Sequence, residues 1–434
     1  MDIDGKGIQG EEFVNELAYS SYLKFWCYPE PKDEFGDKKE IADLLILFKE
    51  VAIIVSVKNY EFKGQYERYF RRTISKAVSQ IYGAERKLFG SKGEVFIKHP
   101  QKEVEKFVPN QYDRILRLIV NLGDDVQFYP TGLLTNGGKY VHVLDKTSFE
   151  AIVNELDTIP DLVDYFLSKE SIFNGKDVVI LPGEEHVFDE ETGEQYFKFL
   201  KESFSQGDKK SIIISGREQD LLAKYLEGDR KFGEYFGEDY TNMLLDIDGA
   251  WDNYLQREEV VLKKSHDKIS YFIDELVEKE VLVNNSEFNV SLARELLSLN
   301  RFERRIIGQG FFEVFKQYAG NDGWHMGRRH GKVGEILISF IVYGKSMKDE
   351  AVNTFLELAL KGYSLFEGFK TAKSVLIAVN SDMSQFKLGY VVDIVPFDAE
   401  YEVLLRQDLK KMKWFQNPTM TPYSFQEYPE SNQS

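Results

Sequence analysis

Two apolar runs separated by a charged pair dominate the hydrophobic pattern near the start of the chain. Residues 41–58 read IADLLILFKEVAIIVSVK, in which LLILF and VAIIV flank Lys49 and Glu50. Each run has the length of a strand and is apolar throughout, which is typical of strands buried on both faces. The pattern predicts a tight hairpin of two buried strands. Asp43 stands at the start of the first strand and Lys58 at the end of the second.

Helical periodicity appears on both sides of this hairpin. Residues 10–25 place apolar side chains at helical spacing, and Glu11 lies on the same side of that predicted helix. Stabilisation of the helix dipole in the first turn is the alternative explanation for Glu11. A long helix is predicted over residues 65–89. Its apolar stripe consists of Ile74, Ala77, Val78, Ile81, Ala84 and Leu88.

Shorter elements follow in the middle of the chain. A helix is predicted over residues 146–155, and a further helix begins at Pro160 with Asp157 or Thr158 as its cap. The segment DIDGAWDN at residues 246–253 lacks the alternating acids and closing glutamate of an EF-hand, so a turn is expected there. The predicted strands cover residues 114–121, 140–144, 177–181 and 211–215.

The last third begins with a basic helix, RFERRIIGQGFFEVFKQY, and continues with the glycine-rich stretch GNDGWHMGRRHGKVGE. We expect that stretch to be a loop, with contact to phosphate or to a partner as the alternative. His325 and His330 are five residues apart and would not share a helix face, which disfavours a metal pair. A helix over residues 350–368 and strands over residues 337–343, 375–379 and 390–394 complete a second α/β layer.

Length and element order together predict an α/β protein of several domains. A chain of 434 residues is too long for one small core. We expect a first domain at residues 1–150, a mixed α/β middle region at 151–300, and a C-terminal α/β domain at 301–434.

Charge is distributed unevenly. The chain has 55 Lys and Arg against 72 Asp and Glu, a net charge of −17, which argues against broad coating of nucleic acid. Residues 58–102 nevertheless carry eleven Lys and Arg against four Glu, an excess of +7. This asymmetry favours a local nucleic-acid contact, and a solvated helix face is the alternative. The candidate contact residues are Lys63, Arg68, Arg71, Arg72 and Lys76.

Other features bear on the compartment. Cys27 is the only cysteine, so an internal disulfide is excluded and a cytoplasmic location is expected. The first ten residues lack the apolar segment of a secretory signal, and no run of about 18 apolar residues predicts a membrane span. Neither a P-loop nor a GxGxxG motif after a strand is present, which disfavours a nucleotide-binding enzyme.

The acids and the lysine near the hairpin suggest a metal-assisted site. Glu11, Asp43 and the Val57 carbonyl would offer hard oxygen ligands to Mg²⁺ or Mn²⁺. The metal would activate a water molecule and stabilise charge on a phosphate, and Lys58 would offset developing negative charge beside it.

This arrangement resembles the PD-(D/E)xK nuclease superfamily, which has the restriction-endonuclease-like fold, over roughly residues 7–150. The Gly-Glu start of the first helix (GEEFV) is similar to the nuclease-related domain and to the nuclease modules of modified-DNA restriction enzymes. The segment SQIYGAER resembles the second core helix of that group, which implies that Gln80 faces the site. The resemblance implies an α/β/α core and a metal-dependent endonuclease acting on DNA, with RNA as the alternative. It also suggests bacterial restriction or anti-phage defence, by analogy alone.

One position departs from that family. The motif has an acid, or in some branches a glutamine, two residues before the lysine, where this chain has Ser56. Metal binding would then rest on Glu11 and Asp43, or an acid such as Glu61 would contribute, or the site has lost activity. The rival hypothesis is therefore a catalytically degenerate module that binds nucleic acid or protein. Residues 151–434 would serve recognition, regulation, a protein partner or homo-oligomer formation.

Overall fold

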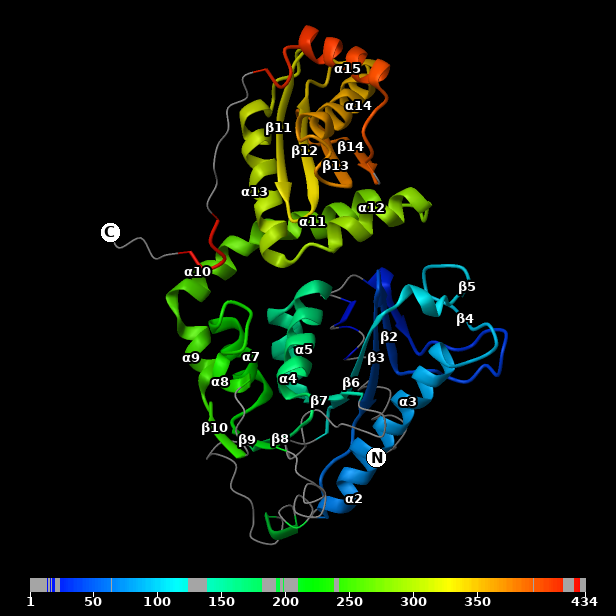
Figure 1. Cartoon of the computed structure of the whole chain (residues 1–434), viewed down its shortest axis with the longest axis vertical. Helices are drawn as coiled ribbons and strands as arrows, with labels where there is room; N and C mark the ends of the chain where they lie inside the picture. Colours follow the sequence, from blue (N-terminus) through cyan, green and yellow to red (C-terminus); the bar gives the residue numbers. More distant parts are fainter. Residues whose placement is uncertain are drawn as a thin grey trace. The chain divides into compact units, whose positions relative to one another are not determined.

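The computed structural model shows an α/β protein, and contacts within the chain divide it into two units, residues 1–260 and 261–434 (Figure 1). This division differs from the expected boundaries at residues 150 and 300. The structure describes residues 14, 16, 18, 19, 24–63, 65–123, 139–181, 193–195, 198, 210–237, 242–392, 394–416 and 425–429.

A five-stranded mixed sheet with strand order β1-β2-β3-β6-β7 lies at the centre of the first unit. The first three strands form an antiparallel meander, β6 runs parallel to β3, and β7 runs parallel to β6. The predicted hairpin is confirmed, because β2 and β3 pair from Leu44↔Val55 to Phe48↔Val51 around Lys49 and Glu50. The strands are β1 (Cys27–Pro29), β2 (Leu44–Phe48), β3 (Val51–Lys58), β6 (Arg114–Asn121) and β7 (His142–Asp145).

Helices lie on both sides of this sheet, with α3 on one face and α4 and α5 on the other (Figure 1). The helix predicted over residues 65–89 is a succession of α2, a π-helical segment η2, and α3. The helix predicted over residues 10–25, including Glu11, lies largely outside the described residues. The elements are η1 (Lys24–Trp26), α2 (Tyr66–Phe70), η2 (Arg71–Ser75), α3 (Lys76–Phe89), β4 (Phe96–Ile97), β5 (Glu105–Lys106), η3 (Pro109–Gln111), α4 (Lys146–Glu155) and α5 (Ile159–Phe173).

Two helices of the first unit begin with side-chain caps. The Asp145 carboxylate accepts a hydrogen bond from the Ser148 amide and starts α4. Thr158 caps α5 by accepting from the Asp161 amide, which confirms one of the two predicted caps. Such caps satisfy backbone donors that have no partner inside the helix.

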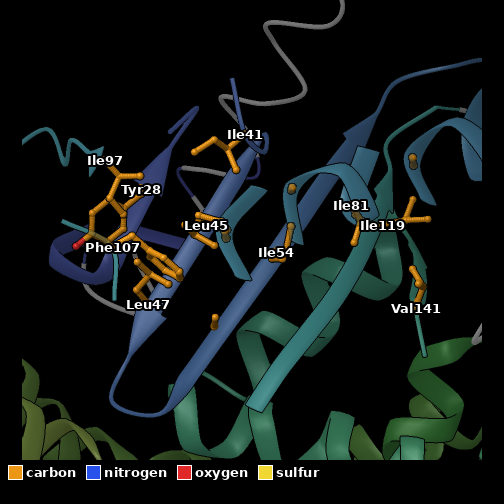
Figure 2. Close-up of a cluster of buried hydrophobic side chains, with 14 of the residues drawn as sticks. Tyr28, Ile41, Leu45, Leu47, Ile54, Ile81, Ile97, Phe107, Ile119 and Val141 are labelled. Carbon is orange, nitrogen blue, oxygen red and sulfur yellow. The ribbon is translucent and has the colours of Figure 1, made fainter. Parts of the chain in front are cut away.

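The main hydrophobic core of this unit lies between α3 and the sheet (Figure 2). Leu45 and Leu47 of β2, with Ala52 and Ile54 of β3, belong to this core. Because side chains alternate along a strand, Asp43 continues the row of Leu45 and Leu47, and Ser56 and Lys58 continue the row of Ala52 and Ile54. Strand alternation therefore directs these polar side chains to the side of the sheet that α3 covers.

A buried ion pair joins α3 to the sheet beside this core. Arg117 of β6 donates to Glu85 of α3 through Nε (2.7 Å) and Nη2 (3.0 Å), and Lys139 also binds the Glu85 carboxylate. Burial would raise the pKa of Glu85, but the hydrogen bonds from Arg117 and Lys139 lower it below its usual value. Removing one partner would leave a charge buried without compensation, so the pair fixes the position of α3 on the sheet.

A three-stranded parallel sheet with the order β10-β9-β8 follows in the same unit. The sequence predicted β8 and β9 but not β10. The turn expected over residues 246–253 covers only Asp248 and Gly249, because Asp246 ends β10 and the chain is helical from Ala250. Gly249 (φ +75°) ends that turn and opens α9. The elements are β8 (Lys176–Leu181), β9 (Lys210–Ser215), α7 (Glu218–Glu227), α8 (Glu234–Gly237), β10 (Asn242–Asp246), α9 (Ala250–Gln256) and α10 (Glu258–Asp267), which crosses into the second unit.

Contacts explain why residues 151–260 belong with the preceding chain. Helix α4 contacts β6, β7 and α7, so it links the two sheets of the first unit. The buried Lys169 ammonium of α5 donates to the Glu218 carboxylate of α7 at 2.6 Å, and Tyr165 donates to the same carboxylate at 2.8 Å. These contacts make the three-stranded sheet and its helices part of the first unit.

The second unit contains a four-stranded sheet with the order β11-β12-β13-β14, in which β12 and β13 are parallel and both outer strands are antiparallel to them. Among the described residues, no helix is both long and apolar enough to span a membrane. The elements are η4 (Lys268–Ser270), α11 (Tyr271–Leu276), η5 (Val277–Val281), α12 (Glu287–Leu297), α13 (Arg301–Tyr318), β11 (Met326–Val333), β12 (Ile336–Tyr343), α14 (Asp349–Phe366), β13 (Lys373–Asn380), β14 (Phe386–Val391) and α15 (Ala399–Lys411).

The loop expected over residues 320–335 is wrong for Met326–Val333, which form β11 and include His330, whereas His325 lies just before the strand. Residues Met326–Val333 pair with every residue of the buried strand β12, from Met326↔Tyr343 to Val333↔Ile336. The glycines and charged residues of this segment gave no strand pattern. The backbone hydrogen bonds offered by β12, and not the hydrophobicity of β11 itself, therefore determine its conformation.

Shortening a core side chain should show how much the core under α3 contributes to the free energy of unfolding. We expect Ile119→Ala to lower the free energy of unfolding by about 2–5 kcal/mol and Ile119→Val by about 0.5–1.5 kcal/mol, because Ile119 is fully buried in the core under α3. Urea denaturation would measure both changes. A loss below about 1 kcal/mol for Ile119→Ala would show that this core is loosely packed.

The buried histidine of β7 should make stability depend on pH. Burial, with the nearby charges of Lys169 and Arg117, holds the pKa of His142 well below 6.5. Below that pH the unfolded chain binds a proton that the folded chain does not, so the free energy of unfolding falls as pH falls.

A His142→Gln variant should lack this contribution. Its free energy of unfolding should fall less than that of the wild type between about pH 7.5 and pH 5. Burial also raises the pKa of Glu170, which hydrogen bonds to His142, to about 7, and that effect has the opposite sign. The difference between the two proteins therefore reports on His142. Parallel pH profiles would contradict the expectation.

Candidate functional site

Asp43 is held at the open end of the β2–β3 hairpin by the backbone of the neighbouring strand. The Val57 amide donates a hydrogen bond to Asp43 Oδ2. Asp43 is only 8% exposed, so this hydrogen bond replaces water that the carboxylate has lost. The contact fixes the carboxylate beside the last residues of β3.

The Lys58 ammonium reaches back over the same strand end. Its Nζ lies 2.9 Å from Ser56 Oγ, 2.7 Å from the Val57 carbonyl oxygen and 3.7 Å from Asp43 Oδ2. The side chain is 14% exposed. Asp43 and Lys58 therefore meet on one side of the sheet, as the sequence required for a joint site, and a cation already lies among their oxygen atoms.

Helix α3 brings a further polar side chain to this place. Ser56 Oγ donates to Gln80 Oε1 at 3.5 Å, although the Gln80 side chain is otherwise exposed. Ile81 and Ala84, which follow on the same helix, are buried against the sheet and hold α3 at this distance. The structure therefore brings together Asp43, Ser56, Lys58 and Gln80. Glu11 lies outside the described residues.

Two neighbouring residues were not identified from the sequence. Asn121 ends β6 in register with Lys58, and its side-chain amide donates to the Tyr69 hydroxyl at 2.6 Å. Asn121 is fully buried and belongs to the same row of β6 as Arg117 and Ile119. The alternation in RILRLIVN would have placed Asn121 on this side, but only the parallel pairing of β3 with β6 puts it next to Lys58.

Four of the five predicted nucleic-acid contacts lie on the helix that follows β3, and Lys63 precedes this helix. The side chains of Lys63, Arg68, Arg71, Arg72 and Lys76 are all exposed. Arg72 donates to the Tyr60 hydroxyl at 3.1 Å and lies over that ring, with its guanidinium carbon 5.4 Å from the centroid. The exposed cations form a positive strip along α2, η2 and the start of α3, which is compatible with contact to phosphates.

A pocket of about 510 Å³ opens beside Asp43, between α3 and the segment that precedes β2. Asp43, Ser56 and Gln80 are among the residues that line it. At its rim, Lys87 pairs with Asp33 at 2.7 Å and with Asp37 at 3.5 Å. The Asp33 hydrogen bond raises the pKa of Lys87, so this cation stays charged and neutralised by its two partners.

The oxygen atoms around Lys58 fit a hard divalent cation in their chemistry. The Asp43 carboxylate and the Val57 carbonyl are ligands of the kind that Mg²⁺ accepts, and Mg²⁺ commonly keeps several waters beside one or two carboxylates. Among the described residues, however, no group of three or more His, Cys, Asp and Glu side chains is arranged around a common point. Within that part of the chain, Mg²⁺ would depend on Asp43 and Val57, with Ser56 contributing a hydroxyl.

Comparison with known proteins does not assign the chain to a family. No protein-family model matches the chain, and no curated protein matches it in sequence. The resemblance to PD-(D/E)xK nucleases therefore rests on the residues described above.

Proposed function

We propose that the first unit hydrolyses phosphodiester bonds of nucleic acid, with DNA as the favoured substrate. The observation that carries the proposal is the convergence of Asp43, Ser56 and Lys58 on the α3 side of the sheet, with the Lys58 ammonium 3.7 Å from Asp43 Oδ2. An acid and a lysine at adjoining ends of two buried strands rarely occur without a partner or a chemical role.

Lys58 is suited to act on the phosphate. Its ammonium binds the Ser56 hydroxyl and the Val57 carbonyl at one end of a sheet, where a phosphate oxygen could replace either neutral oxygen. A cation at that position stabilises the negative charge that develops as water attacks phosphorus and the leaving oxygen departs. Asp43 holds the ammonium in place electrostatically, and Gln80 orients Ser56.

A divalent cation is part of the proposal. Asp43 and the Val57 carbonyl, with Glu11 if the first helix brings it near, would hold Mg²⁺ or Mn²⁺. Such an ion, when bound, supplies an activated water and neutralises phosphate charge. The exposed cations from Lys63 to Lys76 would hold the sugar–phosphate backbone, and this term weakens with salt.

Loss of the charge of Asp43 or of Lys58 should slow cleavage strongly. We expect Asp43→Asn and Lys58→Met each to slow cleavage of plasmid and single-stranded DNA at least about 100-fold in Mg²⁺ or Mn²⁺, because each removes a charge next to the reacting phosphate. Lys370→Met, which removes an exposed lysine of the second unit, is the matched control and should cut at the wild-type rate. Gel assays with the full chain would measure the rates.

Two results would count against the nuclease. Cleavage that is equally fast in wild type, Asp43→Asn and Lys58→Met would assign it to a contaminant or to another site. A wild-type protein that binds DNA but cuts nothing in either metal would favour the rival hypothesis, a degenerate module in which Ser56 marks the lost acid.

An acid at position 56 should increase the affinity of the site for Mg²⁺. We expect Ser56→Asp to lower the Mg²⁺ concentration for half-maximal cleavage by roughly tenfold, because metal affinity rises with the number of charged ligands. Ser56 is among the residues that line the pocket, and its hydroxyl lies 2.9 Å from the Lys58 ammonium, which would pair with the added carboxylate. Ser79→Asp adds the same charge at an exposed position of α3 and should have no such effect. An unchanged Mg²⁺ requirement in Ser56→Asp would mean that the metal does not bind at this strand end.

A further inference from the structure

We propose that the pocket beside Asp43 receives one unstacked nucleotide of the substrate strand, so that the substrate of the first unit is single-stranded or locally unpaired nucleic acid. This inference rests on the proposed function, because it assigns a substrate class to the same site. It goes beyond that function because the pocket, in addition to the residues at the ends of β2 and β3, would determine which nucleic acids are bound.

The pocket is continuous with the proposed catalytic residues. Asp43, Ser56 and Gln80 line it, and Lys58 Nζ lies 2.9 Å from Ser56 Oγ, so a strand whose phosphate lies at Lys58 has an adjacent nucleotide within reach of the pocket. Asp43 is one of the proposed catalytic residues and also lines the pocket. In the simplest arrangement, the nucleotide in the pocket and the phosphate at Lys58 therefore belong to the same nucleic-acid strand.

The dimensions and lining of the pocket suit a nucleotide. A volume of about 510 Å³ lies within the range of small-ligand sites and exceeds what a water cluster requires. Its lining combines apolar side chains, which suit the faces of a base, with polar and charged ones. The apolar lining consists of Ile41, Ala42, Ile54, Val55, Ile81 and Ala84.

Gly83 keeps the pocket open on the helix side. It lines the pocket from the middle of α3, and a Cβ added there would meet no atom within 4 Å. Glycine within a helix costs about 0.5–1 kcal/mol relative to alanine, and no backbone strain or close approach explains its presence at this position. The space beside Gly83 is thus available to a ligand.

The pocket is lined by three cations, Lys39, Arg86 and Lys87, and by three acids, Asp37, Glu40 and Asp43. Lys39 and Arg86 line the pocket, and their side chains have no ion-pair partner among the described residues. Lys87, by contrast, is neutralised by Asp33 and Asp37. Lys39 and Arg86 can therefore bind a phosphate group, and the lining carboxylates can accept hydrogen bonds from the donor edge of a base.

An intact duplex cannot use such a pocket. Bases in a duplex are stacked inside the helix, and a side pocket receives a base only after it has left the stack, at a cost of a few kcal/mol. Single strands present unstacked bases without this cost. The proposal therefore predicts a preference for single strands that depends on open space at Gly83.

Filling the pocket tests this preference in the full chain. Binding of a fluorescent single-stranded DNA of about 12 nucleotides and of the matched blunt duplex would be measured in EDTA, where metal-dependent cleavage cannot occur. We expect Gly83→Leu to weaken single-strand binding at least about tenfold and to change duplex binding less than about twofold. Gly83→Ala should bind nearly as the wild type does. Ser79→Leu, which adds the same side chain at an exposed position of α3, is the matched control, and thermal melting would verify folding of each variant.

Three results would overturn the inference. These are wild-type single-strand binding by folded Gly83→Leu, an equal loss for single strand and duplex, and Gly83-dependent binding of free thymidine monophosphate without any effect on the oligonucleotide. The last result would identify the ligand as a free nucleotide. Hydrolysis of bis(4-nitrophenyl) phosphate by the wild type, Asp43→Asn and Lys58→Met tests the proposed function separately, so that failure of one proposal is distinguished from failure of the other.

Discussion

The hydrogen bond from the Val57 amide to the Asp43 carboxylate is the constraint on which the candidate site depends. It ties the beginning of β2 to the end of β3 and leaves the Asp43 carboxylate facing Lys58. Strand alternation puts Asp43, Ser56 and Lys58 on the side of α3, and the buried pair of Glu85 and Arg117 holds α3 over them. If any of these contacts were lost, the polar side chains would no longer point to one place.

Local patterns were sufficient to predict much of the fold. The hairpin, the strand Arg114–Asn121 and the helix Lys146–Glu155 follow from runs of apolar residues and from caps that lie within a few positions of each other. The sequence did not predict that Asp43 and Lys58 share one side of the sheet, because that depends on the register of β2 with β3. Elements stabilised by distant partners were missed, because β11 has no apolar pattern of its own and exists through its pairing with β12. Asn121 was missed for the same reason, since its place beside Lys58 results from the pairing of β3 with β6.

Two arginine-rich helices show what composition alone cannot distinguish. In α13, Arg301 and Arg304 bind the Asp274 carboxylate at 2.7 and 2.5 Å, and Arg305 binds Asp267 at 3.0 Å. All three arginines are buried, so this basic segment serves internal packing of the second unit. The sequence RYFRR before α3, in contrast, keeps its arginines exposed. The position of acids on neighbouring helices, which the sequence does not reveal, decides whether a basic helix can contact a polyanion.

The two-residue connection between β2 and β3 also has a kinetic consequence. Phe48 pairs with Val51 around Lys49 and Glu50, so the hairpin closes with little loss of chain entropy. The pairing of β3 with β6 must instead bring together strands separated by residues 59–113. Hairpins form within microseconds, whereas non-local pairings are slower. Asp43, Ser56 and Lys58 therefore belong to the part of the sheet that the chain can assemble first, before the helix that carries Gln80 has a complete surface to cover.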